Sequence, residues 1–188
     1  MQHNIISITN NSSIKIIRGF CKIDLLDYYK SILHFQQDKF NYGGKVVKSP
    51  SLYCFMSNTI PDYWYSGQPH KAIPIDEKTH NFLEFFSTKY FYNGIVFNLY
   101  RDGNDSIAWH ADDEKQINQE IPIASLSFGG SRLFEYRCKD KIESIELHSG
   151  DLIFMQGKFQ QECLHRINKD KTRNDERLNL TFRNYNAT

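Results

Sequence analysis

A histidine and an aspartate two residues apart, His110 and Asp112, could together hold a metal ion. On an extended strand, residues i and i+2 project from the same face, so the imidazole and the carboxylate would lie close together. A second imidazole would complete a two-histidine, one-carboxylate set, which suits Fe(II) and leaves coordination positions open for other ligands. Downstream, His148 and His165 could supply it. A His-x-Asp pair also occurs by chance on polar strands, so this pair alone does not establish a site.

The segment from residue 177 to residue 183 alternates strictly between polar and apolar side chains, which is the period of a β-strand. One face carries Arg177, Asn179, Thr181 and Arg183, and the other carries Leu178, Leu180 and Phe182. The apolar face must pack against the core. The polar face could belong to a solvated outer strand. Beside a metal site, however, two arginines would form a clamp for a dicarboxylate, because each planar guanidinium donates two hydrogen bonds to a carboxylate.

Several motifs accompany these two segments in a fixed order along the second half of the chain. They are Asn98-Leu99-Tyr100, Asp102-Gly103, His110-Ala111-Asp112-Asp113-Glu114, Pro122 to Gly129, Gly150-Asp151-Leu152, His165 and Arg177 to Arg183. A weaker match, Tyr63-Trp64-Tyr65-Ser66-Gly67, lies upstream. In this combination the chain resembles the AlkB-like 2-oxoglutarate- and Fe(II)-dependent dioxygenases, particularly the animal-type members that repair alkylated bases.

The resemblance implies Fe(II), 2-oxoglutarate and O2 as cofactors. It assigns the metal to His110, Asp112 and His165, and we expect His148, at a turn before Gly150, to lie on the surface. Arg177, Asn179 and Tyr100 would bind the distal carboxylate of 2-oxoglutarate, and Arg183 and Asn98 would bind the metal-proximal carboxylate. Thr181 lies on the same strand face as the two arginines. An extended strand separates the two arginine Cα atoms by roughly 20 Å at about 3.3 Å per residue, so both side chains must lean inward.

The resemblance also implies contacts to the substrate. Except for Asp113, the residues that would make them lie upstream of the metal ligands in the sequence. Tyr65 would stack on an extruded base and Tyr63 would hydrogen-bond its edge, although aromatic residues in strands more often belong to the core. Asp113 would face the substrate, unless it is a solvated loop acid. Tyr42, in a lysine-rich turn, could wedge into a base stack, or the turn could be an ordinary exposed hairpin.

The resemblance therefore implies oxidative demethylation of N-alkylated bases, of the N1-methyladenine and N3-methylcytosine type, in DNA or RNA. The N-methyl group is hydroxylated and lost as formaldehyde, which is direct alkylation repair. Three alternatives stay open. The substrate could be a protein or a small molecule, the same ligands could serve a zinc hydrolase, or the chain could be an inactive nucleic-acid-binding module.

The elements that must position these residues indicate an α+β, mainly β fold, a double-stranded β-helix (jelly roll) with two helices in the N-terminal half. Helical spacing of apolar residues predicts helices over 24–33 and 76–89. Strands are expected over 94–100 and 177–183, with hairpins joining 121–128 to 132–137 and 143–147 to 152–155. We expect a flexible leader over 1–13 and a single dioxygenase domain over 14–188. Residues 14–93 would hold the helices and nucleotide-recognition hairpins, and 94–188 the jelly-roll catalytic core.

Composition sets the remaining bounds. At 188 residues the chain suits one domain, and a net charge of +1 excludes polyanion binding by overall charge, so a nucleic-acid partner would need a local patch. No apolar run is long enough for a membrane span, and no signal peptide is visible. Cys21, Cys54, Cys138 and Cys163 are widely spaced and are expected to be reduced thiols. We therefore expect a monomer in the cytoplasm or nucleus, not a secreted or membrane protein.

Overall fold

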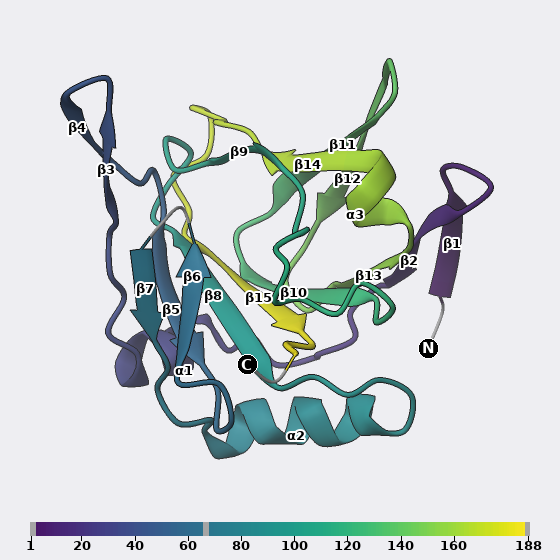
Figure 1. Ribbon diagram of the computed structural model, residues 1–188, viewed down its shortest axis with the longest axis horizontal. Coiled ribbons are helices and arrows are strands. Elements are labelled where there is room, and N and C mark those ends of the chain that lie inside the picture. Colours follow the sequence, from purple (N-terminus) through teal and green to yellow (C-terminus); the bar gives the residue numbers. More distant parts are fainter. Residues whose placement is uncertain (1–2, 66–67, 187–188) are drawn as a thin grey trace.

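Two antiparallel β-sheets face each other and form the body of the molecule (Figure 1). The computed structural model describes residues 3–65 and 68–186, and at residues 3, 40–42, 64, 65 and 68 it describes the backbone alone. The large sheet has the strand order β1 (His3–Ser7), β2 (Ser12–Ile17), β13 (Leu152–Gly157), β10 (Ile123–Gly129), β15 (Arg177–Arg183), β8 (Gly94–Tyr100) and β5 (Leu52–Met56). The small sheet has the order β12 (Lys141–Leu147), β11 (Arg132–Cys138), β14 (Cys163–Ile167) and β9 (Ile107–His110). The prediction of a mainly β jelly roll is confirmed.

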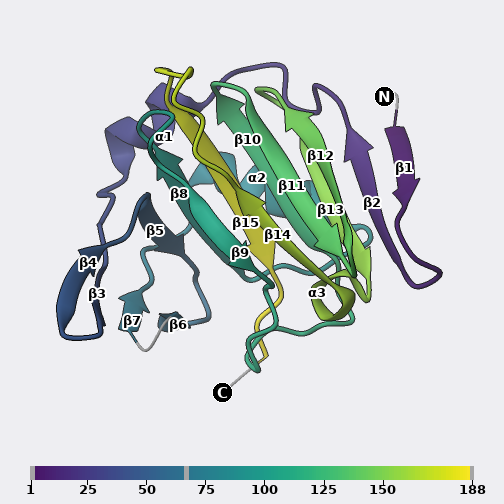
Figure 2. The ribbon, with the colours of Figure 1, turned by 90° about the horizontal axis from the view of Figure 1, so that it is seen from above.

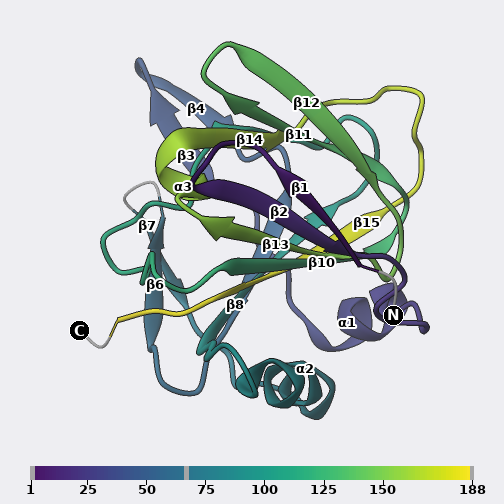
Figure 3. The same cartoon turned by 90° about the vertical axis from the view of Figure 1, so that its right-hand side faces the viewer.

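Helices α1 (Leu26–Ile32) and α2 (Glu77–Ser87) lie on the face of the large sheet that points away from the small sheet (Figure 3). The Asp76 carboxylate accepts hydrogen bonds from the first free backbone amides of α2 and so fixes where that helix begins. Between helices and sheet lies an apolar layer that includes the fully buried Leu178, Leu180 and Phe182 of β15. The two predicted helices are confirmed, with slightly shorter bounds. A third, short helix, α3 (Phe159–Glu162), was not predicted.

The other face of β15 points between the sheets. Arg177, Asn179, Thr181 and Arg183 are all buried there, so the solvated outer strand considered above is excluded. Figure 2 shows β15 and β8 running side by side in the large sheet, with the facing small sheet seen over them. The register of β15 with β8 places Arg177 opposite Tyr100 and Asn179 opposite Asn98. The alternation of β15 and this register together bring the polar residues of two strands to one inner surface.

Two hairpins extend from the same end of the sheets (Figure 1). The first joins β3 (Lys39–Tyr42) to β4 (Lys45–Lys48), and the second joins β6 (Asp62–Tyr65) to β7 (Gln68–Lys71). Gly43 and Gly44 turn the first hairpin with φ of 57° and 81°, values that glycine adopts without strain. The turn expected at Ser66-Gly67 lies outside the described residues.

Both hairpins expected in the catalytic half are absent from the described structure. Strand β10 pairs with β13 and β15, whereas β11 pairs with β12 and β14, so the chain changes sheet at Gly129-Gly130. It changes sheet again between β12 and β13, near Gly150. Glycine at positive φ allows either a tight hairpin or a crossover between facing sheets, and the local sequence does not distinguish the two.

Two further expectations differ from the structure. Residues 3–7 of the expected leader form strand β1, which pairs with β2 at the edge of the large sheet. Cys138 and Cys163, expected to be reduced, form a disulfide, whereas Cys21 and Cys54 are free. The pairing of β11 with β14 places the two cysteines directly opposite each other, with Cα atoms 4.3 Å apart, across a separation of 25 residues that hides this proximity in the sequence. Among the described helices, none has the length and apolar character needed to cross a bilayer.

Candidate metal and co-substrate site

His110, Asp112 and His165 converge between the two sheets, and their candidate ligand atoms all lie within 4.8 Å of one another. His110 ends β9, His165 lies in β14, and the two residues are paired across these strands. Asp112 follows in the loop after β9. Its carboxylate oxygens lie 3.9 Å from Nε2 of His110 and 3.9 Å from Nε2 of His165. The arrangement offers two imidazole nitrogens and one carboxylate to a single point, which is the donor set of a non-haem Fe(II) centre.

Hydrogen bonds and packing fix these three side chains. Nδ1 of His110 lies 2.8 Å from the carbonyl oxygen of Ala108, which orients Nε2 toward Asp112. The ring of His165 stacks on Phe134 with centroids 5.3 Å apart. The side-chain oxygen of Gln160, on α3, accepts a hydrogen bond of 3.0 Å from the backbone amide of Asp112. Each candidate ligand is therefore held by the fold itself.

Charges around the site favour the protonation states that a metal requires. Burial alone would raise the pKa of Asp112, but Arg183 and the two imidazoles lower it below its usual value. Nη2 of Arg183 donates to the Asp112 carboxylate at 2.5 Å. Burial, followed by the charge of His110, lowers the pKa of His165 to about 3. A carboxylate and a neutral imidazole are the forms that bind a cation.

A ladder of polar side chains continues from this trio along the inner surface of the large sheet. Ser125 donates to Asn179 at 2.7 Å, and Asn179 donates to Thr181 at 2.8 Å. One guanidinium nitrogen of Arg177, Nη2, donates to Ser127 at 2.9 Å and to Asn179 at 3.1 Å. Ser125 and Ser127 had no predicted role, yet their alternation with apolar residues in β10 was visible in the sequence.

Arg177 is the clearest indication that this surface binds an anion. The residue is 1% exposed, and its Nε and Nη1 atoms have no hydrogen-bond partner among the described residues. Burial lowers the pKa of Arg177, and no ion pair joins its guanidinium to a carboxylate of the described residues. Arg177 lines a narrow cavity of about 40 Å³ together with Asn98, Tyr100, Asn179, Thr181 and Arg183, and the metal trio also borders it. These donors fit the carboxylates of 2-oxoglutarate.

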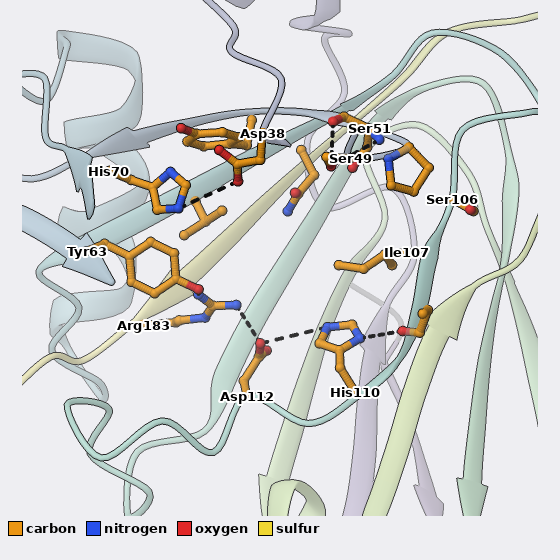
Figure 4. Close-up of a pocket in the computed structure, with 15 residues that line it drawn as sticks. Asp38, Ser49, Ser51, Tyr63, His70, Ser106, Ile107, His110, Asp112 and Arg183 are labelled. Atoms are coloured by element: carbon orange, nitrogen blue, oxygen red, sulfur yellow. Dashed lines mark hydrogen bonds and ion pairs between the residues drawn. The ribbon is translucent and has the colours of Figure 1, made fainter. Parts of the chain in front are cut away.

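A second, larger cavity of about 230 Å³ is bordered by His110 and Asp112 of the trio (Figure 4). His110, Asp112, Arg183 and Asn98 border both cavities. Tyr63 forms part of its wall, and its hydroxyl accepts from Arg183 and donates to Glu114, each at 3.2 Å. The hydroxyl that was expected to meet a base edge is thus already bound to the site's own charged groups. Burial raises the pKa of the Glu114 carboxyl.

The other predicted substrate residues are placed differently. Asp113 is exposed and does not line either cavity, whereas its neighbour Glu114 turns inward to Tyr63. The backbones of Tyr42 and Tyr65 lie in the two hairpins, but their side chains lie outside the described part of the structure. His148 is exposed, as expected. Sequence reasoning missed Tyr185, whose hydroxyl accepts from Arg183 at 3.2 Å, and also Gln160, Asp38 and His70.

The fold and this site define a class of protein, and comparison with known families agrees. The model of the 2OG-Fe(II) oxygenase superfamily matches residues 22–183. The chain belongs to this superfamily.

Individual relatives narrow the likeness to the AlkB-like branch. The chain is 39% identical over 108 residues to the alpha-ketoglutarate-dependent dioxygenase alkB homolog 3 of Bos taurus, covering 52% of this chain and 38% of the relative. It is 31% identical over 153 residues to the DNA oxidative demethylase ALKBH2 of Bos taurus, covering 74% of this chain and 55% of that protein. The matches thus span between about a third and just over half of these relatives. A solved structure described as that of OsALKBH1 shares the fold with a TM-score of 0.60 at 16% identity, and the match covers 96% of this chain and 100% of that one.

Proposed function

We propose that this protein is an oxidative demethylase of N-alkylated bases in nucleic acid, using Fe(II), 2-oxoglutarate and O2. The observation that carries the proposal is that His110 and Asp112 border two cavities of different character. One is narrow and lined by buried donors that suit a dicarboxylate, and the other is wider and partly aromatic. The relatives named above, a dioxygenase and a DNA oxidative demethylase, support nucleic acid as the substrate class.

In this proposal His110, Asp112 and His165 hold the metal, and Arg177 binds the distal carboxylate of 2-oxoglutarate. When bound, Fe(II) with 2-oxoglutarate and O2 supplies the oxidation of a nearby C–H bond. Arg183 fixes the Asp112 carboxylate and stands where the two cavities meet. The apolar residues on the cavity walls exclude water, and Tyr63 and its neighbours position the methyl group near the metal. The hydroxymethyl product then releases formaldehyde and leaves the unmodified base.

The two partnerless nitrogens of Arg177 favour this function over a zinc hydrolase with the same ligands. A hydrolase needs only the metal and its bound water. It would leave a fully buried arginine without a counter-charge, which costs stability and serves no step of the reaction.

The test incubates the purified protein with Fe(II), 2-oxoglutarate and oligonucleotides that carry N1-methyladenine or N3-methylcytosine. We expect formaldehyde and the restored base in equal amounts, and dependence on 2-oxoglutarate. An Asp112→Ala variant should abolish both products. Consumption of 2-oxoglutarate without restored base, on DNA and RNA alike, would move the substrate to a protein or small molecule. Activity independent of 2-oxoglutarate would contradict the dioxygenase assignment.

A further inference from the structure

The disulfide between Cys138 and Cys163 joins the last pair of residues in a ladder of the small sheet. Cys138 is the final residue of β11 and Cys163 is the first of β14, and they are the outermost partners in the register of these two strands. The ends of secondary-structure elements open more readily than their middles. The disulfide therefore closes the ladder where it would otherwise fray.

The next inward-facing pair of the same ladder carries a candidate metal ligand. Two residues along β14 from Cys163, His165 pairs with Tyr136 of β11, and on its other side it pairs with His110 of β9. Cys163 and His165 lie on one face of β14, and both are buried. A change in the position of Cys163 should thus be passed along β14 to His165.

The short helix α3 gives the disulfide a second connection to the trio (Figure 1). The helix ends directly before Cys163, and Phe159 at its start packs against the ring of His165 with centroids 5.9 Å apart. Gln160 of the same helix accepts the hydrogen bond from the backbone amide of Asp112. Two of the three candidate ligands are therefore positioned by segments that the disulfide anchors.

The disulfide is enclosed, yet a surface cavity borders each of its cysteines. Cys138 and Cys163 are 7% and 3% exposed. Cys138 lines a cavity of about 630 Å³ that also touches the turn between β1 and β2, and Cys163 lines a second cavity of about 580 Å³. Lys139 and Asp140, which connect β11 to β12, border both cavities. These cavities give small thiols a way to approach the pair, and access is one of the factors that set the rate of thiol–disulfide exchange.

We propose that Cys138 and Cys163 form an exchange site for small thiols, and that the closed disulfide favours metal binding at the trio. The inference rests on the metal-binding role that the proposed function gives to His110, Asp112 and His165. It adds control of that site by redox state.

The exchange is balanced between the cysteine pair and a dithiol. One thiolate of the dithiol attacks a sulfur of the disulfide and forms a mixed disulfide, while the other protein sulfur leaves as a thiolate and takes up a proton. The second thiolate of the dithiol then attacks the mixed disulfide, which closes the reagent into a cyclic disulfide and releases the second protein thiol. Two electrons and two protons pass from the dithiol to the protein, and two molecules of a monothiol achieve the same result.

Coupling between the two sites must be reciprocal. If the closed disulfide raises metal affinity by a given factor, bound metal shifts the exchange equilibrium toward the disulfide by the same factor. Metal affinity and the exchange equilibrium are therefore two independent measurements of one quantity, and neither depends on catalytic activity.

The test titrates Mn(II) calorimetrically into the oxidised protein and into protein reduced with a phosphine, which is then removed under nitrogen. We expect the reduced protein to bind Mn(II) at least about fivefold more weakly. In graded mixtures of reduced and oxidised dithiothreitol, saturating Mn(II) should favour the closed disulfide by the same factor, as alkylation and mass spectrometry can show. Reduction should also speed amide hydrogen exchange in residues 159–166 more than in the large sheet.

Two double variants are the matched controls. Cys21→Ala/Cys54→Ala removes the free cysteines and keeps the disulfide, so it should respond to reduction as the wild type does. Cys138→Ala/Cys163→Ala should bind Mn(II) as weakly as the reduced wild type, with or without the phosphine treatment.

Equal Mn(II) affinity of the oxidised and reduced wild type would overturn the proposal. Complete unfolding on reduction, seen by circular dichroism, would overturn it too, because the pair would then be a structural cross-link only. This comparison needs no substitution, so it holds even where a variant does not fold. Absence of Mn(II) binding in both states contradicts the metal role of the trio, and this inference falls with it. Redox-dependent Mn(II) binding without demethylation supports this inference and contradicts the proposed function alone.

Discussion

Arg177 shows at the scale of one residue how a binding function opposes stability. Two of its nitrogens have no hydrogen-bond partner among the residues that the structure describes, and an unneutralised buried cation destabilises the fold. In Arg177→Met, whose side chain is of similar length but apolar, we expect 2-oxoglutarate to bind at least about tenfold more weakly, since a hydrogen bond to a charged group contributes about 1.5–3 kcal/mol. The free energy of unfolding should stay the same or rise. Calorimetric titration of the anaerobic metal-loaded protein and denaturant unfolding measure the two effects.

Arg173→Met is the control for that substitution. Arg173 is a partly exposed arginine that pairs with Glu146 outside both cavities. Its loss should leave 2-oxoglutarate affinity unchanged. Equal weakening in both variants would show that Arg177 acts only through general positive charge.

His165 makes the stability of the metal-free protein depend on pH. Its pKa falls from 6.5 to about 3 on folding, so below pH 6.5 the unfolded chain takes up a proton that the folded chain does not. The contribution of neutral His165 to the free energy of unfolding is therefore fully present above pH 6.5 and is lost as the pH falls toward 3. Between pH 8 and pH 5.5 the wild type should lose about 1.4 kcal/mol more unfolding free energy than His165→Gln. Denaturant unfolding with a chelator present measures this difference, and equal losses in both proteins would contradict it.

At the scale of elements, the disulfide between β11 and β14 fixes the strand that carries His165. Reduction should lower the free energy of unfolding by about 3 kcal/mol, because a cross-link across 25 residues restricts the unfolded chain. Alkylation of the unreduced, unfolded protein should label Cys21 and Cys54 alone, as mass spectrometry can show. The double variant Cys138→Ala/Cys163→Ala should be insensitive to reductant. Labelling of all four cysteines would show that the disulfide does not form.

Some elements could be predicted from the sequence because their signal is local. Strand β15 was expected at its observed bounds, since its alternation is strict and both faces are informative. The helical spacing of apolar residues predicted α2, and the structure adds the Asp76 carboxylate that caps its first turn. The resemblance named the three residues that the structure brings together as a possible metal centre.

Other features depend on which strands pair, and local sequence does not carry that information. The sheet changes at Gly129-Gly130 and near Gly150 were expected as hairpins, because glycine permits both outcomes. Cys138 and Cys163 meet only through the register of β11 with β14. Asp38 and His70 likewise meet across two intervening strands and a hairpin, so no spacing rule relates them.

At the scale of the molecule, the site joins the two sheets. His110 and His165 come from the small sheet, and Arg183, which binds Asp112, comes from the large sheet. A cation at the trio would therefore bind one sheet directly and the other through the Asp112–Arg183 pair. Binding of metal and of 2-oxoglutarate should accordingly stabilise the whole fold. The metal should bind first and 2-oxoglutarate second.

We expect Mn(II), a redox-stable substitute for Fe(II), to raise the free energy of unfolding by about 2.7 kcal/mol at a hundred times its dissociation constant. 2-Oxoglutarate should add a second increment only when the metal is present, because its keto acid needs the cation and its distal carboxylate needs Arg177. Arg177→Met should keep the first increment and lose most of the second, and Asp112→Asn should lose both. Thermal or denaturant unfolding of the three proteins with each addition separates these cases. Equal stabilisation by 2-oxoglutarate with and without metal would mean that the arginines bind it alone, and that the trio and the clamp are separate sites.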